Sequence, residues 1–247
     1  MRDARELSTR HRGTRRVLLQ AALTCAERWR WPVLPGAVLL ERADGRGPAG
    51  RGPCCSCGEP GCPVPGAHPH ELALLAATTD ARMVRWWWER HCPQAPVLVP
   101  TGQAVAAVSV PAAVGGRLLA YLAALRIGTG PVLAGPTRWA LLVAPYGYPE
   151  LAELLAEQER TLCPGGGPGR VPSSVRFHGP GGYLVLPPSW VGRAPGAPGG
   201  AAGAQLRWVR RPVPGPGGGV WLPPVAGLLE ALVAAGSAVP DGSRLAY

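Results

Sequence analysis

Two hydrophobic patterns alternate along the chain, one with the period of an α-helix and one typical of short buried strands. Apolar residues spaced for one helix face predict a helix over residues 14–30, and leucines opposite glutamates predict another over residues 151–162. Nearly continuous apolar runs predict buried strands at residues 96–100, 104–110 and 139–143. Because strands alternate with helices, the sequence predicts a mixed α/β or α+β domain.

Three consecutive tryptophans lie in a further predicted helix. Asp80 can cap this helix, which continues over residues 81–91 and contains Trp86, Trp87 and Trp88. Successive residues of a helix point about 100° apart, so the three indoles cannot all face one core. We therefore expect at least one of them at the surface, in a cleft or in an interface.

Charge is unevenly distributed over the 247 residues. The formal net charge is +10, the chain has arginine but no lysine, and no acidic residue lies between Glu89 and Glu150. Such a chain attracts polyanions, and arginine binds phosphate through a planar fork. A hydrophobic content of 47% excludes wholesale disorder. No apolar run reaches the ~18 residues of a spanning helix, and no cleavage site follows the basic N-terminus, so we expect a cytoplasmic protein without a membrane partner.

A cluster of cysteines stands in a Gly/Pro-rich loop, residues 54–70, with the sequence CCSCGEPGCPVPGAHPH. In a cytoplasmic chain such thiols indicate a metal site rather than a disulfide framework. Zinc prefers four sulfur or nitrogen ligands in tetrahedral geometry, and tight turns let neighbouring ligands converge. The residues therefore predict a structural zinc site. The candidate ligands are Cys57, Cys62 and His68 with either Cys54 or Cys55, and His70 is an alternative to His68.

Four segments, in their order along the chain, resemble one family. They are AALTCAERWRWPVLPG, CSCGEPGCPVPGAHP, AATTDARMVRWWWERHCPQAPVLVPTG and GGYLVLPPSW. Together they resemble the N-terminal domain of bacterial bifunctional DNA primase/polymerases (prim-pol), in the archaeo-eukaryotic primase superfamily, over roughly residues 17–210. The resemblance implies an α+β primase core around an RRM-like mixed sheet flanked by helices. Family members with a Cys-x-Cys-x4-Cys-x5-His insert have it at this place, which favours Cys55 over Cys54.

The resemblance also implies where catalysis would occur, and this chain departs from the family there. Prim-pol members hold Mg²⁺ or Mn²⁺ with an acidic pair at the positions of Ser109 and Pro111. Trp139 stands nearest to the family's nucleotide-binding histidine, and Ser174 stands at a third acid. None of these side chains is a strong metal ligand, so we expect no catalytic residue here and no Mg²⁺ or Mn²⁺.

These observations lead to three functional hypotheses. The first is a catalytically inactive prim-pol domain that still binds DNA or a nucleotide, with Arg138, Arg176 and His178 as phosphate ligands. The second is a regulatory or scaffold protein that uses the fold for contacts with a protein partner. The third is an active primase/polymerase whose acids come from elsewhere, such as Glu89 or Glu150.

The end of the resemblance gives a domain boundary. We expect residues 14–210 to form the prim-pol-like domain, followed over residues 211–247 by a Gly/Pro linker and a last helix packed on the same domain. Near the boundary, arginines flank Trp208. Arginine can bind phosphate there while the indole stacks on a base. Alternatively, the indole belongs to the strand core and the arginines are its solvated neighbours.

Overall fold

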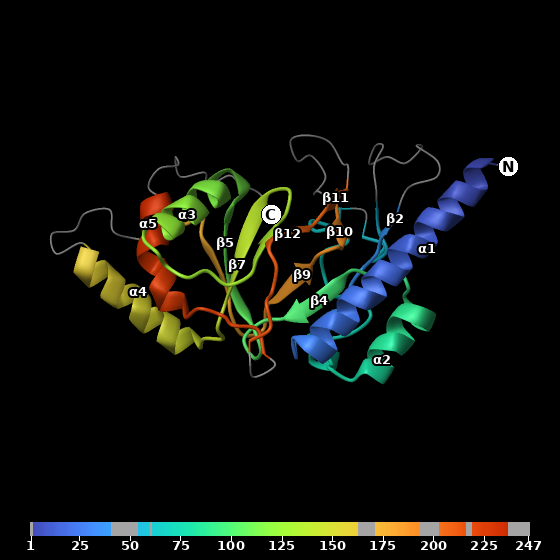
Figure 1. Ribbon diagram of the computed structural model, residues 1–247, viewed down its shortest axis with the longest axis horizontal. Helices are drawn as coiled ribbons and strands as arrows, with labels where there is room; N and C mark the ends of the chain where they lie inside the picture. The colour runs from blue at the N-terminus through green and yellow to red at the C-terminus, as the bar shows by residue number, and fades with distance from the viewer. Residues whose placement is uncertain are drawn as a thin grey trace. The chain divides into compact units, whose positions relative to one another are not determined.

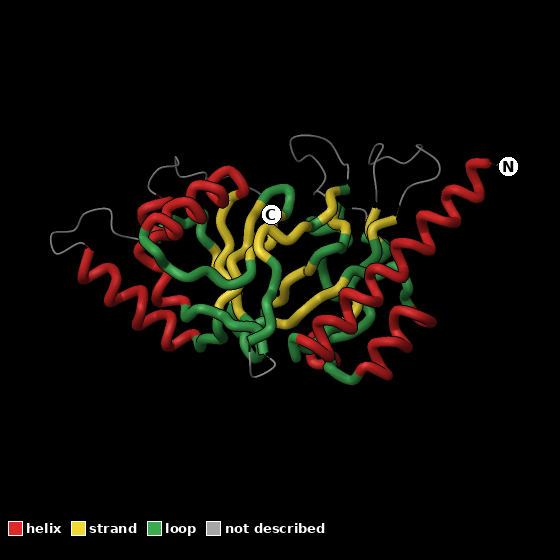
Figure 2. The backbone as a smooth tube through the Cα atoms, viewed as in Figure 1, coloured by secondary structure: helices red, strands yellow, loops and turns green. Residues whose placement is uncertain are grey.

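The computed structural model describes residues 2–40, 54–59, 61–162, 171–192, 203–215 and 219–236. The chain divides into two compact units. The first comprises the residues up to Val99 together with Tyr183–Arg207, and the second comprises Pro100–Gly182 and Trp208–Ala246. Each unit combines helices with antiparallel strands (Figures 1 and 2), so the fold is α+β, as predicted.

The second unit is built on a five-stranded sheet with the order β12-β6-β7-β5-β8. Strand β5 is antiparallel to both β7 and β8, and β6 is antiparallel to β7. Along the chain the elements follow as β-α-β-β-α-β with the first strand between the third and the fourth, the arrangement expected for an RRM-like sheet. The elements are β5 Ala106–Pro111, α3 Ala112–Ala124, β6 Val132–Ala134, β7 Arg138–Val143, α4 Tyr148–Leu162, β8 Arg176–His178, β12 Arg207–Arg210, a 3₁₀ turn Val225–Leu228 and α5 Leu229–Gly236.

Helices cover one face of this sheet. Val108 and Val110 of β5 pack with leucines of α3, α4 and α5 in one hydrophobic core. Figure 1 shows these three helices on the same side of the sheet. Because side chains alternate along a strand, Ala107, Ser109 and Pro111 point to the opposite face. Ser109 and Pro111, the positions at which the resemblance places the family's acidic pair, therefore lie on the face away from the helices.

The first unit joins helices to short strands. Strands β1, β4 and β9 form one sheet with β4 in the middle, while β2 pairs with β3 and β10 with β11. The elements are α1 Arg2–Leu23 with a π-helical turn Thr24–Arg28, β1 Leu34–Pro35, β2 Leu39–Leu40, β3 Cys54–Cys55, a 3₁₀ turn Leu74–Ala76, α2 Ala81–Trp86 with a π-helical turn Trp87–His91, β4 Val97–Pro100, β9 Tyr183–Leu186, β10 Trp190–Val191 and β11 Ala204–Gln205.

The three consecutive tryptophans divide between core and surface. Trp87 and Trp88 are 4% and 1% exposed, and Nε1 of Trp88 donates a hydrogen bond to the carbonyl of Ala95 (2.9 Å). Trp86 is 51% exposed and stacks on the ring of His91. The prediction that at least one indole lies at the surface is confirmed.

Candidate functional site

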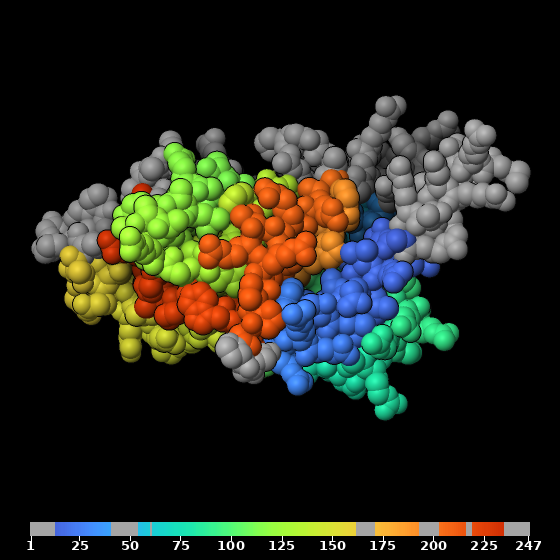
Figure 3. Space-filling view, in the orientation of Figure 1, coloured from blue at the N-terminus to red at the C-terminus, as the bar shows by residue number. Residues whose placement is uncertain are grey.

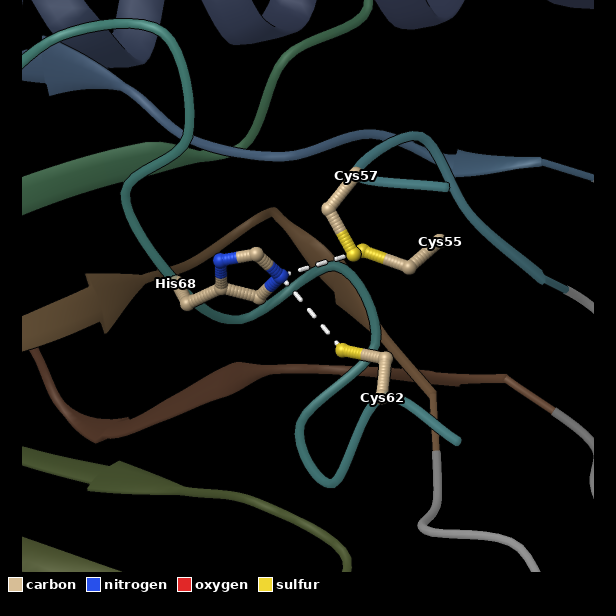
Figure 4. A group of neighbouring side chains, drawn as sticks. All are labelled: Cys55, Cys57, Cys62 and His68. Atoms are coloured by element: carbon tan, nitrogen blue, oxygen red, sulfur yellow. Dashed lines mark hydrogen bonds between the residues drawn. The ribbon is translucent and has the colours of Figure 1, made fainter. Parts of the chain in front are cut away.

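Three cysteines and a histidine meet in the first unit (Figure 4). The ligand atoms of Cys55, Cys57, Cys62 and His68 all lie within 4.8 Å of one another. We call this group the Cys55 cluster. Three sulfurs and an imidazole nitrogen at such distances could hold a metal ion. In the part of the chain that the structure describes, no second group of three or more His, Cys, Asp or Glu side chains comes together in this way.

A short strand decides which of two neighbouring cysteines enters the cluster. Strand β3 pairs with β2, with Cys55 opposite Leu39 and Cys54 opposite Leu40. Successive side chains of a strand point to opposite faces. The cluster therefore contains Cys55 and not Cys54.

Backbone contacts shape the loop around the sulfurs. The N–H of Ser56 donates to the carbonyl of Val38 (2.9 Å), and Oγ of Ser56 accepts from the N–H of Val38 (2.8 Å). Gly58 and Gly66 have φ values of +76° and +70°, which favour glycine. The N–H of Gly66 donates to Sγ of Cys55 (3.4 Å). These contacts bring the thiols of the cluster together, although only Cys55 among them lies on a strand.

His68 presents one ring nitrogen to the sulfurs. Its Nδ1 lies 2.7 Å from the carbonyl oxygen of Pro69, which can only accept, so Nδ1 carries the hydrogen. Nε2 then has a lone pair, and it lies 3.2 Å from Sγ of Cys55 and 3.4 Å from Sγ of Cys62. A carbonyl that fixes the tautomer is a common partner of a metal-binding histidine. His70 is exposed and lies outside the cluster.

The thiols of the cluster differ in acidity. A hydrogen bond from the backbone of Glu59, followed by smaller contributions from the other members of the cluster, lowers the pKa of Cys57 to about 7. Burial raises the pKa of Cys62 to about 12. A cation bound between the sulfurs would favour the thiolate at both positions.

In the second unit, polar side chains gather on the sheet face opposite the helices. Ser109 of β5 pairs with Arg176 of β8, and Pro111 of β5 pairs with Arg138 of β7. Residues directly opposite each other share a face, and so does His178, two residues beyond Arg176. The three predicted phosphate ligands therefore lie on the same face as Ser109. We call this surface the Ser109 face.

Ser109 is the centre of a hydrogen-bond network. The residue is 3% exposed, and its Oγ accepts from Nε of Arg138 (3.0 Å) and lies 2.8 Å from Nε2 of His178. Nη2 of Arg138 donates to the carbonyls of Ser109 and Ser174, both at 2.7 Å. Because Oγ already accepts from Arg138, its own hydrogen can be donated to His178. The network joins three strands through neutral acceptors.

This network contains a half-buried positive charge. Burial, followed by the charge of Arg176, lowers the pKa of Arg138 to about 10, which leaves its guanidinium protonated at neutral pH. Burial and then the charges of Arg138 and Arg176 lower the pKa of His178 to about 4, so its imidazole is neutral. No ion pair among the described residues involves Arg138. The electrostatics favour an anion here over a metal cation.

The acidic side chains described in this unit lie on helices. No carboxylate stands on any of the five strands of the sheet, all of which the structure describes. Helices α4 and α5 pack mainly through their leucines on the face opposite Ser109. The described acids of the unit are Glu150, Glu153, Glu157 and Glu159 on α4 and Glu230 on α5.

Trp139 lies on the other face of the sheet from Ser109. Its indole packs against Gly115 of α3 so closely that a Cβ at that glycine would lie 2.3 Å from the ring. The resemblance places Trp139 nearest to the family's nucleotide-binding histidine, but the alternation of β7 puts its neighbour Arg138 on the Ser109 face. Trp139 and Arg138 are neighbours on β7 and therefore point to opposite faces, so the residue on the Ser109 face is Arg138 and not Trp139.

The sequence left open whether Trp208 is exposed for stacking on a base or buried in the strand core, and the structure places it between these two cases. Trp208 of β12 is half-buried, and Arg207, Arg210 and Arg211 beside it are exposed. Nη1 of Arg210 donates to the carbonyl of Thr129 (2.9 Å), which fixes this arginine against the loop before β6.

The fold and the two sites describe an α+β domain with an RRM-like sheet and a Cys₃His cluster. The family model described as bifunctional DNA primase/polymerase, N-terminal, matches residues 22–221, and the chain belongs to this family. The resemblance seen in the four sequence segments is thereby confirmed. Neither a search of curated proteins nor a search of solved structures finds a match. None of the described helices is long and apolar enough to cross a membrane.

Proposed function

We propose that the chain is a catalytically inactive prim-pol domain whose Ser109 face binds a phosphate group of a nucleic acid or nucleotide. One observation carries the proposal: the Ser109 face holds a protonated arginine bonded to neutral groups, on a sheet whose strands carry no carboxylate. Two-metal phosphoryl transfer needs carboxylate oxygens that hold the cations. A guanidinium at the same place repels those cations and attracts the phosphate itself.

The position of Arg138 supports phosphate binding. Three hydrogen bonds hold its Nε and Nη2 groups, which fixes the guanidinium before any ligand arrives. Its Nη1 group makes no hydrogen bond with another described residue, so its donors can point to an anion. The second guanidinium, that of Arg176, is close enough to lower the pKa of Arg138. An anion between the two charges would relieve their repulsion.

An extension assay tests the absence of catalysis. The full chain is given a primed template and deoxynucleotides with Mg²⁺ or Mn²⁺, and we expect no product above a metal-free control. Product that requires the metal would overturn the inactive assignment and favour recruited acids. Glu150 is exposed at the start of α4, where one of its carboxylate oxygens accepts from the N–H of Gly147. Glu89 lies in the first unit.

A nucleotide titration without metal tests phosphate binding. We expect dATP to shift the imidazole signals of His178 in NMR spectra, and Arg138→Gln to weaken binding about 10-fold or more, because charged hydrogen bonds to phosphate are strong. Arg176→Gln gives a second variant on the same face, and Arg117→Gln on the exposed side of α3 is the matched control. Equal binding by wild type, Arg138→Gln and Arg176→Gln would show that phosphate binds elsewhere or not at all.

We further propose that the Cys55 cluster holds a structural zinc ion. A tetrahedral zinc with bonds of about 2.3 Å to sulfur and 2.0 Å to nitrogen separates the two ligand atoms by about 3.5 Å. The distances of 3.2 and 3.4 Å from His68 Nε2 to two sulfurs are close to this value. Four protein ligands leave no open position, which supports a structural role. The ion would tie β3 to the loop that ends at His68.

A second candidate function is contact with a protein partner, and the surface of α2 favours it. Trp86 is 51% exposed and Met83, one helical turn earlier, is 43% exposed. Exposed aromatic and methionine side chains are frequent in protein interfaces. Capture of a partner that resists nuclease and is lost in Trp86→Ala would support this candidate. The cytoplasmic location and the domain boundary at residue 210 stay predictions.

A further inference from the structure

An exposed indole and an exposed arginine lie against neighbouring residues of the loop before β6, and a second exposed arginine stands in the same loop, away from the residues of the Ser109 face. Trp221 is 57% exposed, and its ring lies against Gly128, where a Cβ would be 3.0 Å from Cη2. Arg210 is bonded to the carbonyl of Thr129, the residue after Gly128. Arg126, two residues before Gly128, is also exposed. We call Arg126, Gly128, Thr129, Arg210 and Trp221 the Trp221 patch.

The indole is held in place by the segment that follows it. The N–H of Ala144 donates to the carbonyl of Pro223 (2.8 Å), and Gly130 lies so close to Pro223 that a Cβ would be 2.7 Å from its ring. Glycines at 128 and 130 therefore let residues 221–223 lie along the loop before β6. Figure 3 shows the orange atoms of the C-terminal part of the chain, which includes β12, against the light green atoms of α3 and the following loop.

The patch combines a flat apolar surface with positive charge. No described ion pair involves Arg126 or Arg210, and no acidic residue occurs in residues 90–149 or 204–229 of the sequence. Exposed indole next to unneutralised guanidinium groups matches a chain of bases joined by phosphates, because the base stacks on the ring while the phosphate meets the arginine. An acidic surface patch on a protein would match the charge but leave the ring without a flat partner.

We propose that the Trp221 patch binds single-stranded nucleic acid by stacking one base on Trp221 and placing adjacent phosphates on Arg126 and Arg210. The proposal goes beyond phosphate binding at the Ser109 face and does not depend on it. Paired bases do not expose their faces, so the patch should prefer single strands to duplexes.

The experiment measures the anisotropy of a fluorescein-labelled, 20-nucleotide oligothymidylate with the full chain at several salt concentrations. We expect Trp221→Ala to weaken binding about 10-fold or more, and Arg210→Gln to weaken it and to reduce the salt slope by about 0.7. Gly128→Ala, whose new methyl group displaces the ring, should lower affinity less in the same direction. Trp86→Ala, which removes an indole of similar exposure in the first unit, is the matched control.

Several outcomes would overturn the proposal. They are wild-type binding too weak to measure, equal affinity for a duplex of the same length, equal losses in Trp221→Ala and Trp86→Ala, or normal oligonucleotide binding in Trp221→Ala. A protein captured by wild type and lost in Trp221→Ala, with oligonucleotide binding unchanged, would assign the patch to a protein interface instead. Arg138→Gln distinguishes the two sites. If this variant loses oligonucleotide binding and Trp221→Ala does not, the oligonucleotide binds at the Ser109 face and the proposal for the Trp221 patch is wrong.

Discussion

The Cys55 cluster and the Ser109 face gather polar side chains in the two units of the chain, and their chemistry is opposite. The cluster offers three sulfurs and an imidazole nitrogen whose lone pair points inward. The Ser109 face offers a protonated guanidinium, a hydroxyl group and a neutral imidazole. The first set of groups suits a metal cation, and the second suits an anion.

The comparison shows that the Ser109 face, whose strands carry no carboxylate, satisfies its polar groups through neutral partners. Arg138 donates to Oγ and to the carbonyl of Ser109 and to the carbonyl of Ser174, and Oγ of Ser109 also lies within hydrogen-bond distance of Nε2 of His178. A buried polar group that is bonded in this way costs little, whereas an unbonded one destabilises the fold. Ser109 and the Nε and Nη2 groups of Arg138 are therefore hydrogen-bonded on a face whose strands carry no carboxylate.

The largest expected effect is the loss of the metal from the Cys55 cluster. We expect Cys55→Ser to abolish zinc binding and to lower the free energy of unfolding of the first unit by about 5 kcal/mol or more, because structural zinc contributes strongly to folding. Cys54→Ser, on the other face of β3, should keep the metal and the stability. Metal analysis of the purified chains and thermal denaturation measure both effects. Equal metal loss in the two variants would mean that Cys54 is also a ligand.

Short-range patterns predicted most of the fold. The apolar runs at 96–100, 104–110 and 139–143 correspond to β4, β5 and β7, and the amphipathic pattern at 151–162 lies within α4. The cysteine spacing predicted a cluster whose members all lie within fifteen residues of sequence. These features depend on neighbouring residues, which is why the sequence alone contains them.

Long-range pairing accounts for what the sequence did not predict. Ser109, Arg138 and His178 were each singled out, but their contact depends on the register of three strands, across as many as 69 residues. The same register turns Trp139 to the core and Arg138 to the Ser109 face. A one-residue uncertainty in aligning β7 is enough to exchange them. The contact between Trp221 and Gly128 likewise has no local signal.

The pH dependence of stability between pH 6.5 and pH 4 sharpens the contrast, because it tests His178 on the Ser109 face. The pKa of His178 is lowered from 6.5 to about 4, so below pH 6.5 the unfolded chain takes up a proton that the folded chain does not. Stability should fall from pH 6.5 to pH 4, by about 3 kcal/mol from this residue, and level off below. Chemical denaturation of wild type and His178→Gln across this range gives the difference. Parallel curves for the two proteins would show that His178 is not buried beside two arginines.

Removing one hydroxyl group from each region compares their hydrogen bonding. Ser109→Ala leaves Nε of Arg138 without its acceptor and the imidazole of His178 without its donor. We expect the free energy of unfolding to fall by about 1–3 kcal/mol. Ser56→Ala in the loop of the Cys55 cluster removes only the bond to the N–H of Val38, so about 1 kcal/mol is expected. Denaturant titration measures both. A smaller loss at Ser109 than at Ser56 would mean that water replaces the hydroxyl on the Ser109 face.

The smallest expected effect concerns a glycine near each site. Gly181, in the turn after His178, has φ +79° and open space around its Cβ position, so Gly181→Ala should cost only the backbone strain of about 1 kcal/mol. Gly66 has φ +70°, but its Cβ would lie 3.0 Å from Cβ of Leu39, so Gly66→Ala should cost more and weaken metal binding. Thermal denaturation and metal analysis of the two variants measure these effects. If Gly181→Ala proves the more destabilising change, the turn after His178 is packed more tightly than the open space around the Cβ position of Gly181 indicates, and the expected order of the two glycine variants is wrong.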